Sequence, residues 1–380
     1  MRLSNSTKIY DTASSSFTDK SDEVLNQKIK ELEPTDYKLA IETYFSELGS
    51  SKKRIDYLRN KAKSATKAYE QLYVHQCSKE ETFKLFENFQ RFEKILFQSH
   101  EYRAHYVHQF DVYLLGYYIL NKFLQGRSSN LQDYLSLVLR GNSNNPNFTW
   151  MLAATFHDMG YPIEKVDSWF KEFLSLFLKV DTPIQFGLDQ LLTPIFYEYI
   201  GYISEIHYHR GNPSLTQGKS TQRDWRFHNI LHNELRQKDH GVISSLLLIH
   251  SLLTQEVVGK HQEWFYGTFP LEILPACHAI AIHNLKLKQY KISLKQFPYA
   301  FLLVLCDALQ DWKRSAPAKD YSELVDINVS PMEPKIEAKL RINDSNKKLG
   351  ELKTLEERLN TENLINIKIM NAQGKESCVL

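Results

Sequence analysis

The feature that most constrains the fold of this chain is a long region whose apolar residues recur at helical spacing. From about residue 83 to residue 314 the sequence is dense in such residues, and the stripe Phe110, Leu114, Tyr117 is one example. Residues three and four apart share one face of a helix, whereas no stretch here alternates convincingly as a half-buried strand does. Polar clusters at 141–146 and 211–224, both containing glycine, are typical of loops. The sequence therefore predicts a mainly α fold with a helical bundle core.

The segments on either side of this region have different patterns. Residues 1–21 are rich in Ser, Thr, Asp and Lys without periodicity, and we expect them to be disordered. Beyond the core, strands are predicted over 325–329, 335–342 and 364–370, around a helix over 349–360 and with a turn at 371–374. We therefore divide the chain into a tail (1–21), an N-terminal helical region (22–90), a helical core domain (91–316) and a small α+β domain (317–380).

Composition argues against several classes of partner. Hydrophobic residues make up 42% and charged residues 24% of the 380 residues, which is typical of a globular protein. The formal net charge of +2 gives no bulk attraction to nucleic acids or membranes, and no apolar run is long enough to span a bilayer. The four cysteines have no paired spacing, and no secretory signal is recognisable. We therefore expect a cytoplasmic protein with no membrane or nucleic-acid partner.

A histidine and an aspartate end one of the most apolar segments of the core. His157 and Asp158 follow the run from Met151 to Phe156 and come just before Gly160. An imidazole and a carboxylate at a buried position are unfavourable unless something compensates them, and a metal ion is the usual compensator. Histidines and another aspartate elsewhere in the core strengthen the interpretation of this dipeptide as part of a metal site.

Further candidates stand on other predicted helices. In chain order they are His105, His108, His240, His278, His283 and Asp307. His105 and His108 share one face of a helix because they are three residues apart. Asp307 has apolar neighbours on every side of its predicted helix, so an ionised carboxylate there needs a cation or several hydrogen-bond donors. The pattern indicates a metal site assembled from several helices.

Taken in order, these residues resemble the pattern of the HD superfamily of metal-dependent phosphohydrolases. The matching segments are 103–108 (RAHYVH), 156–162 (FHDMGYP), 240–244 (HGVIS), 280–284 (IAIHN) and 305–307 (LCD). The resemblance covers about residues 95–314 and depends on the order of all these segments together. It implies an HD-type helical bundle core and an activity on phosphate esters.

The resemblance also implies a ligand set. Carried over position by position, it assigns metal binding to His108, His157, Asp158, His240, His283 and Asp307. Asp158 would bridge two ions and is the expected catalytic residue. His105 and His278 are candidates for supporting positions beside the ligands, and Arg103, Lys238 and Lys286 are the nearest candidates to contact substrate phosphates.

The charges of this ligand set suit a phosphate substrate. Two carboxylates against two divalent ions leave a positive site. A water activated by the metal could then attack phosphorus while the protein positions the substrate. Imidazole and carboxylate ligands together favour Mn, Fe, Ni, Co or Zn, as one or two ions, over Ca. We therefore expect a metal-dependent phosphohydrolase acting on a nucleotide-like phosphomonoester or phosphodiester.

Two other functions stay open at this point. An HD-type protein could bind a nucleotide or a partner without hydrolysis, as a regulatory or interaction module, and some members of the superfamily use a di-iron centre for oxidative cleavage. The sequence Gly160-Tyr161-Pro162 directly follows His157-Asp158 and differs from the HD-GYP arrangement, so a cyclic dinucleotide is not the expected substrate. The segment between Asp158 and His240 is long for the family and is expected to shape the pocket. The C-terminal part is a candidate for mediating oligomerisation.

Overall fold

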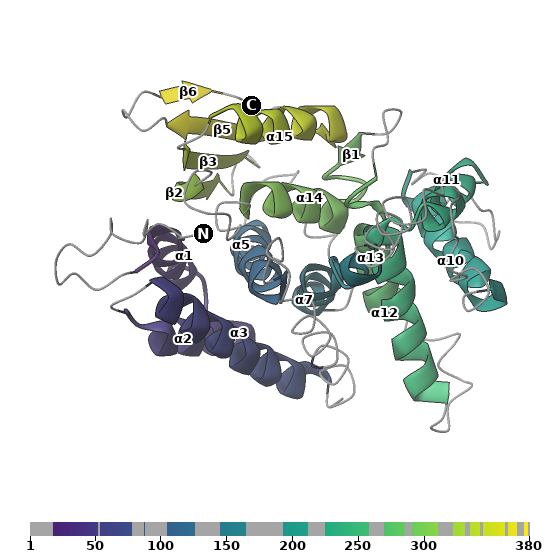
Figure 1. Ribbon diagram of the computed structural model, residues 1–380, viewed down its shortest axis with the longest axis horizontal. Helices are drawn as coiled ribbons and strands as arrows, with labels where there is room; N and C mark the ends of the chain where they lie inside the picture. Colours follow the sequence, from purple (N-terminus) through teal and green to yellow (C-terminus); the bar gives the residue numbers. More distant parts are fainter. Residues whose placement is uncertain are drawn as a thin grey trace, which may run out of the picture.

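The fold is mainly α-helical, with one small mixed sheet near the C-terminus (Figure 1). This confirms the predicted fold class. The structure is a computed structural model, and it describes residues 18–51, 54–77, 87, 105–125, 145–164, 193–211, 225–257, 270–285, 291–310, 322–330, 335–342, 345–361, 364–370 and 376–378. Among these residues, no helix combines the length and the apolar composition that crossing a bilayer requires. The expected turn at 371–374 lies outside the described residues.

The centre of the molecule is built from helices α5, α7, α13 and α14, which pack on one another. The helices of the core are α5 (His105–Gln125), α7 (Pro146–Phe156), α10 (Thr193–Gly211), α11 (Trp225–Arg236), α12 (His240–Val257), α13 (Pro270–Ile282) and α14 (Pro298–Gln310). Helix α7 begins with Pro146 in its first turn, and the Asn145 side chain caps it by accepting a hydrogen bond from the Phe148 amide. Every residue of α7 from Thr149 to Phe156 is buried. The apolar run seen in the sequence is therefore a central core helix, whose end is enclosed by its neighbours.

The C-terminal part folds as a small α+β unit. Its elements are β2 (Ser322–Ser330), β3 (Lys335–Ile342), α15 (Ser345–Arg358), β5 (Ile365–Met370) and β6 (Glu376–Cys378), and the sheet order is β2-β3-β5-β6. Strands β3 and β5 are parallel and α15 connects them, whereas the other neighbouring pairs are antiparallel. Figure 1 shows this unit above α14. The predicted strands and the predicted helix all fall on these elements.

A second contact ties the α+β unit to the helical core. Strand β1 (Ile292–Ser293) lies in the connection between α13 and α14, and it pairs in parallel with β4 (Leu359–Asn360), which directly follows α15. Helix α15 also packs on α14. The end of α15 is thus fixed beside the part of the core that carries His283 and Asp307.

The N-terminal helices pack on both of these regions. They are α1 (Lys20–Lys30), α2 (Asp36–Leu48) and α3 (Arg54–Cys77). Helix α1 begins at Lys20, two residues before the expected start, because Asp19 caps it and Ser21 is buried where its hydroxyl accepts a hydrogen bond from the Leu324 amide of β2 at 3.0 Å. On α3, the buried Lys61 forms ion pairs with Asp22 of α1 at 2.9 Å and with Asp111 of α5 at 2.6 Å. The N-terminal region is therefore joined to the core by buried charges as well as by apolar packing.

Candidate metal centre

The end of α7 forms a tight turn that faces the start of α12. The turn spans residues 157–160, and the Gly160 amide donates a hydrogen bond to the Ser244 hydroxyl at 2.7 Å. A Cβ atom on Gly160 would lie 2.4 Å from the backbone oxygen of His240, which is closer than any real Cβ contact. The absence of a side chain at Gly160 therefore lets the His157-Asp158 turn approach the first residue of α12.

A second glycine allows α12 to approach α13. A Cβ atom on Gly241 would lie 2.9 Å from the Ile280 oxygen and 3.0 Å from the imidazole ring of His283. The two glycines that follow the HD pair and His240 in the sequence thus have the same physical role. They let His157, His240 and His283 come together from three helices without steric conflict.

Each of the four histidines in this region has its Nδ1 atom bound to an oxygen acceptor. His157 donates to the Ala154 carbonyl at 2.9 Å, and His283 donates to the Ile280 carbonyl at 2.7 Å. His240 donates to the Glu164 carboxylate at 2.7 Å, and His108 hydrogen-bonds to the side-chain oxygen of Gln310. A carbonyl or a carboxylate only accepts, so each of these Nδ1 atoms carries a proton, and Nε2 is the ring nitrogen that could ligate a metal ion once it is unprotonated.

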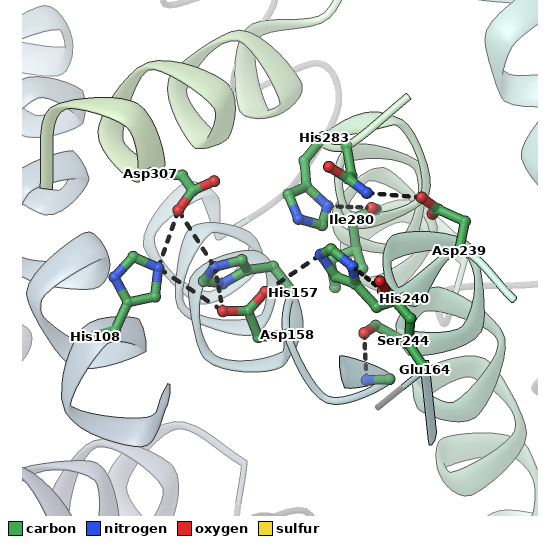
Figure 2. Close-up of polar contacts among 12 residues, drawn as sticks. His108, His157, Asp158, Glu164, Asp239, His240, Ser244, Ile280, His283 and Asp307 are labelled. Atoms are coloured by element: carbon green, nitrogen blue, oxygen red, sulfur yellow. Dashed lines mark hydrogen bonds and ion pairs between the residues drawn. The ribbon is translucent and has the colours of Figure 1, made fainter. Parts of the chain in front are cut away.

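The two aspartates lie among these Nε2 atoms (Figure 2). The Oδ2 atom of Asp158 lies 3.4 Å from Nε2 of His157 and 3.8 Å from Nε2 of His108, and its Oδ1 atom lies 3.5 Å from Nε2 of His240. One carboxylate oxygen of Asp158 therefore faces His108 and His157, and the other faces His240. Asp307 lies on the His108 side, with its Oδ1 atom 2.9 Å from Nε2 of His108 and 4.0 Å from Nε2 of His157.

Burial and charge shift the protonation of the imidazoles in different directions. Burial lowers the pKa of His157, and burial together with the neighbouring His157 and His240 lowers the pKa of His283 to about 3. For His240, burial acts in the same direction, but the hydrogen bond to Glu164 and the charge of Asp158 outweigh it and raise the pKa to about 9. At neutral pH, His157 and His283 are therefore neutral, as metal ligation requires, while His240 holds a proton that a metal would displace.

The donor atoms fit a metal ion. Three overlapping groups, each with its ligand atoms within 4.8 Å of one another, are His108-His157-Asp158, His157-His283-Asp307 and Asp158-His240-His283. The Nε2 atom of His157 is buried and has no hydrogen-bond partner among the described residues, although its other ring nitrogen is fully engaged. A neutral imidazole oriented by a backbone carbonyl, with its second nitrogen directed at carboxylates, is the usual geometry of a metal-binding histidine. These side chains could hold a metal ion.

The six side chains differ in exposure. The side chain of His157 is fully buried and that of Asp158 is 9% exposed, whereas Asp307 on α14 is 29% exposed. Asp307 is therefore the most exposed side chain of the cluster.

The structure brings together six of the residues singled out in the sequence, and it places others elsewhere. Asp158 and its partners His108, His157, His240, His283 and Asp307 converge, as the distances above describe. His278 instead lies beside Phe227 and Phe297 in a separate buried group, where its Nε2 atom lies 3.1 Å from Nδ1 of His207. Lys238 is buried in the turn before α12, with a left-handed backbone. Arg103, Lys286 and the side chain of His105 lie outside the described residues.

Several residues that orient the ligands were not identified from the sequence. Gln310 lies one turn after Asp307 on α14, so the spacing alone could have suggested that it shares a helical face with that aspartate. Glu164 follows the Gly-Tyr-Pro segment and reaches His240 across the chain, which no local signal predicts. Asp239 caps α12 through the Val242 amide at 2.9 Å and accepts a hydrogen bond from Asn284 at 2.7 Å. These contacts fix the start of α12 against the end of α13.

No protein-family model, curated protein or solved structure matches this chain.

Proposed function

We propose that this protein is a metal-dependent phosphohydrolase of the HD type, acting on a nucleotide-like phosphomonoester or phosphodiester. One observation carries the proposal. Four imidazoles, each with Nδ1 bound to an oxygen acceptor, gather with Asp158 and Asp307 within the helical core. The order of these residues along the chain matches the HD resemblance described above.

The ligands divide into two halves around Asp158. His108, His157 and Asp307 would hold one divalent ion with Oδ2 of Asp158, while His240 and His283 would hold a second with Oδ1. When bound, such ions supply Lewis acidity, which lowers the pKa of water and neutralises charge on phosphoryl oxygens. The imidazole and carboxylate donors favour Mn, Fe, Ni, Co or Zn.

The residues of the chain orient the ligands and exclude water from part of the centre. The carbonyls of Ala154 and Ile280 and the side chains of Glu164 and Gln310 hold the four imidazoles in fixed orientations. The buried walls around His157 exclude water from one side of the centre, which strengthens every electrostatic interaction made there. A substrate phosphate approaching past Asp307 would thus meet an array of ligands that needs little reorganisation.

Metal analysis combined with a substrate panel tests this proposal. The wild-type protein is expected to retain a divalent transition metal and to hydrolyse at least one phosphate ester or nucleotide in the presence of Mn. Asp158→Asn keeps the size of the side chain, and it is expected to lose both metal and turnover while keeping its helical circular dichroism. Turnover in Lys353→Gln, which changes an exposed residue of α15, should match the wild type.

The same experiment separates the alternative functions. Folded protein that retains no metal and hydrolyses nothing on the panel would contradict the proposal and favour a non-hydrolytic HD-type binding or regulatory module. Iron-dependent oxygen consumption without phosphate release would contradict it in favour of an oxygenase. Turnover that persists in Asp158→Asn would assign the activity to another part of the chain.

A further inference from the structure

The α+β unit places an arginine beside the metal centre. Arg358 is the last residue of α15, and the next residue, Leu359, begins β4 and pairs with Ile292 of β1. Strand β1 lies on the connection between His283 and Asp307, and α15 packs on α14, the helix that carries Asp307. In Figure 1, α15 lies directly above α14. The position of Arg358 is therefore fixed by a strand pairing on one side and a helix contact on the other.

Two of the three guanidinium nitrogens of Arg358, Nε and Nη2, are buried without a hydrogen-bond partner among the described residues. Arg341 of the same unit, in contrast, donates to the Glu323 carboxylate at 2.7 Å. Leaving charged donors buried and unsatisfied is unfavourable, and a native protein keeps such an arrangement mainly where a ligand completes it.

The charges that act on Arg358 come from the edge of the centre. Burial lowers the pKa of its guanidinium, and the carboxylates of Asp307 and Asp239 oppose that shift. Asp307 is a candidate ligand of the metal, and Asp239 caps α12 next to His240. With a divalent ion bound by Asp307, the surroundings of Arg358 would become more positive, which favours an anion as the acceptor for its guanidinium.

We propose that Arg358 binds the phosphoryl oxygens of the substrate at the His/Asp centre, which makes the C-terminal α+β unit part of the substrate-binding site. The inference rests on the proposed function, since it assigns the anion-binding residue of that same site. A guanidinium offers a planar pair of donors that matches two oxygens of a phosphoryl group. Because α15 and β4 fix the backbone at Arg358, this fork is held in place before the substrate arrives.

Binding of inorganic phosphate tests the role of Arg358 without requiring turnover. The affinity is measured by calorimetry on Mn-saturated wild type, Arg358→Gln, Arg358→Lys and the control Lys353→Gln, which removes a charge from the exposed face of the same helix. Arg358→Gln should weaken phosphate binding by about 10- to 100-fold, the effect of losing hydrogen bonds to a charged group. Arg358→Lys should keep part of the affinity, and Lys353→Gln should keep all of it.

Two further measurements separate a binding role from a structural one. The Mn affinity of Arg358→Gln should equal that of the wild type or exceed it, because a nearby positive charge is removed. Its melting temperature should be unchanged or higher, since removing an unsatisfied buried charge relieves the folded state. A large fall in melting temperature in both Arg358 variants would show that the guanidinium is needed for folding, and would overturn the inference.

The failure of this inference is distinguishable from failure of the proposed function. Mn-loaded Arg358→Gln that binds phosphate as tightly as the wild type would overturn the role of Arg358 and leave the metal centre intact. A wild-type protein that binds no metal would overturn the proposed function, and phosphate binding by the metal-free protein would then decide the inference. Binding that depends on Arg358 would support it, and absence of binding would overturn it.

Discussion

This molecule contains two groups of side chains that include aspartates within its packed helices. The negative charge of the aspartates is compensated differently in the two groups. Between the N-terminal helices and α5, Asp22 and Asp111 share the ammonium of Lys61, and Tyr57 donates a further hydrogen bond to Asp22 at 2.8 Å. At the end of α7, Asp158 and Asp307 lie instead among the Nε2 atoms of imidazoles. Helix α5 contributes one residue to each group, His108 and Asp111, which are less than one turn apart.

The difference indicates what each group is for. An ammonium neutralises a carboxylate permanently, so the Lys61 group joins helices and leaves little capacity for a ligand. An imidazole, unlike an ammonium, gives up its proton readily and can then ligate a cation that neutralises the carboxylate. The first group therefore has its counter-charge within the protein, whereas the second could also hold a metal ion.

Replacing Lys61 should have the largest effect on stability. Lys61→Met leaves the carboxylates of Asp22 and Asp111 buried without their ammonium, and it should lower the free energy of unfolding by about 3–5 kcal/mol in urea titrations. The matched control is Lys67→Met on the same helix, whose pair with Glu47 is exposed and should contribute less than about 1 kcal/mol. Equal losses in the free energy of unfolding for the two variants would contradict the difference between the buried and the exposed ion pair.

Metal binding should stabilise the protein only through the group that contains Asp158 and Asp307. At a metal concentration of about 100 times Kd, ligand binding adds about 2.7 kcal/mol to the free energy of unfolding. Lys61→Met should keep this increment although it starts from lower stability, while Asp307→Asn should lose most of it. Thermal melts with and without Mn measure both. An undiminished increment in Asp307→Asn would exclude that aspartate from the ligand set.

The support that Glu164 gives to His240 should have a smaller effect. Glu164→Gln removes the carboxylate that accepts the Nδ1 proton, and it should weaken Mn binding by about 10-fold, or about 1.4 kcal/mol. Glu198→Gln, which changes an exposed glutamate that accepts from Tyr202 on α10, is the control. Calorimetry above pH 9, where His240 no longer holds a competing proton, isolates this effect, and identical affinities there would contradict it.

The last test is the pH dependence of the metal-free protein. The folded-state pKa values of His157 and His283 are lowered, so their contribution to stability is present above the unfolded value near 6.5 and is lost as the pH falls, for His283 toward about 3. The pKa of His240 is raised to about 9, so its contribution is present below 6.5 and is lost as the pH rises through 9. Each proton changes the free energy of unfolding by at most about 1.4 kcal/mol per pH unit.

Melting temperatures across this range check the sign of both contributions. The metal-free protein should lose stability on both sides of pH 6.5, and saturating Mn should remove the decline on the alkaline side because it displaces the His240 proton. His283→Gln should flatten the acid side. A metal-free profile that rises steadily from pH 6.5 to pH 9 would contradict the proposed state of His240.

The sequence predicted those parts of the molecule that depend on local pattern or on costly residue types. Helical periodicity located the core, and alternating residues located β3 and β5. Asp158 and Asp307 were identifiable because a carboxylate in an apolar segment has few stable roles. The set of six expected ligands came from the HD resemblance, and these residues meet in one cluster.

The parts that the sequence did not predict depend on contacts between distant segments. Glu164 is an ordinary charged residue until α12 brings His240 to it, and the position of Arg358 depends on the pairing of β4 with β1. His278 looked equivalent to His283, yet its position on α13 turns it toward His207 and the aromatic rings of another cluster. The packing of α1 on β2 joins residues about 300 positions apart, for which no local signal exists.

Anomalous X-ray diffraction from crystals grown with Mn tests the central claim most directly, because it locates the ion and its ligands together. The account predicts anomalous density bounded by Nε2 of His157 and the carboxylate of Asp158, with every histidine of the centre binding through Nε2 and keeping its Nδ1 contact. Ordered protein without such density, or with the ion held elsewhere and the Nε2 atom of His157 turned away from Asp158, would contradict it.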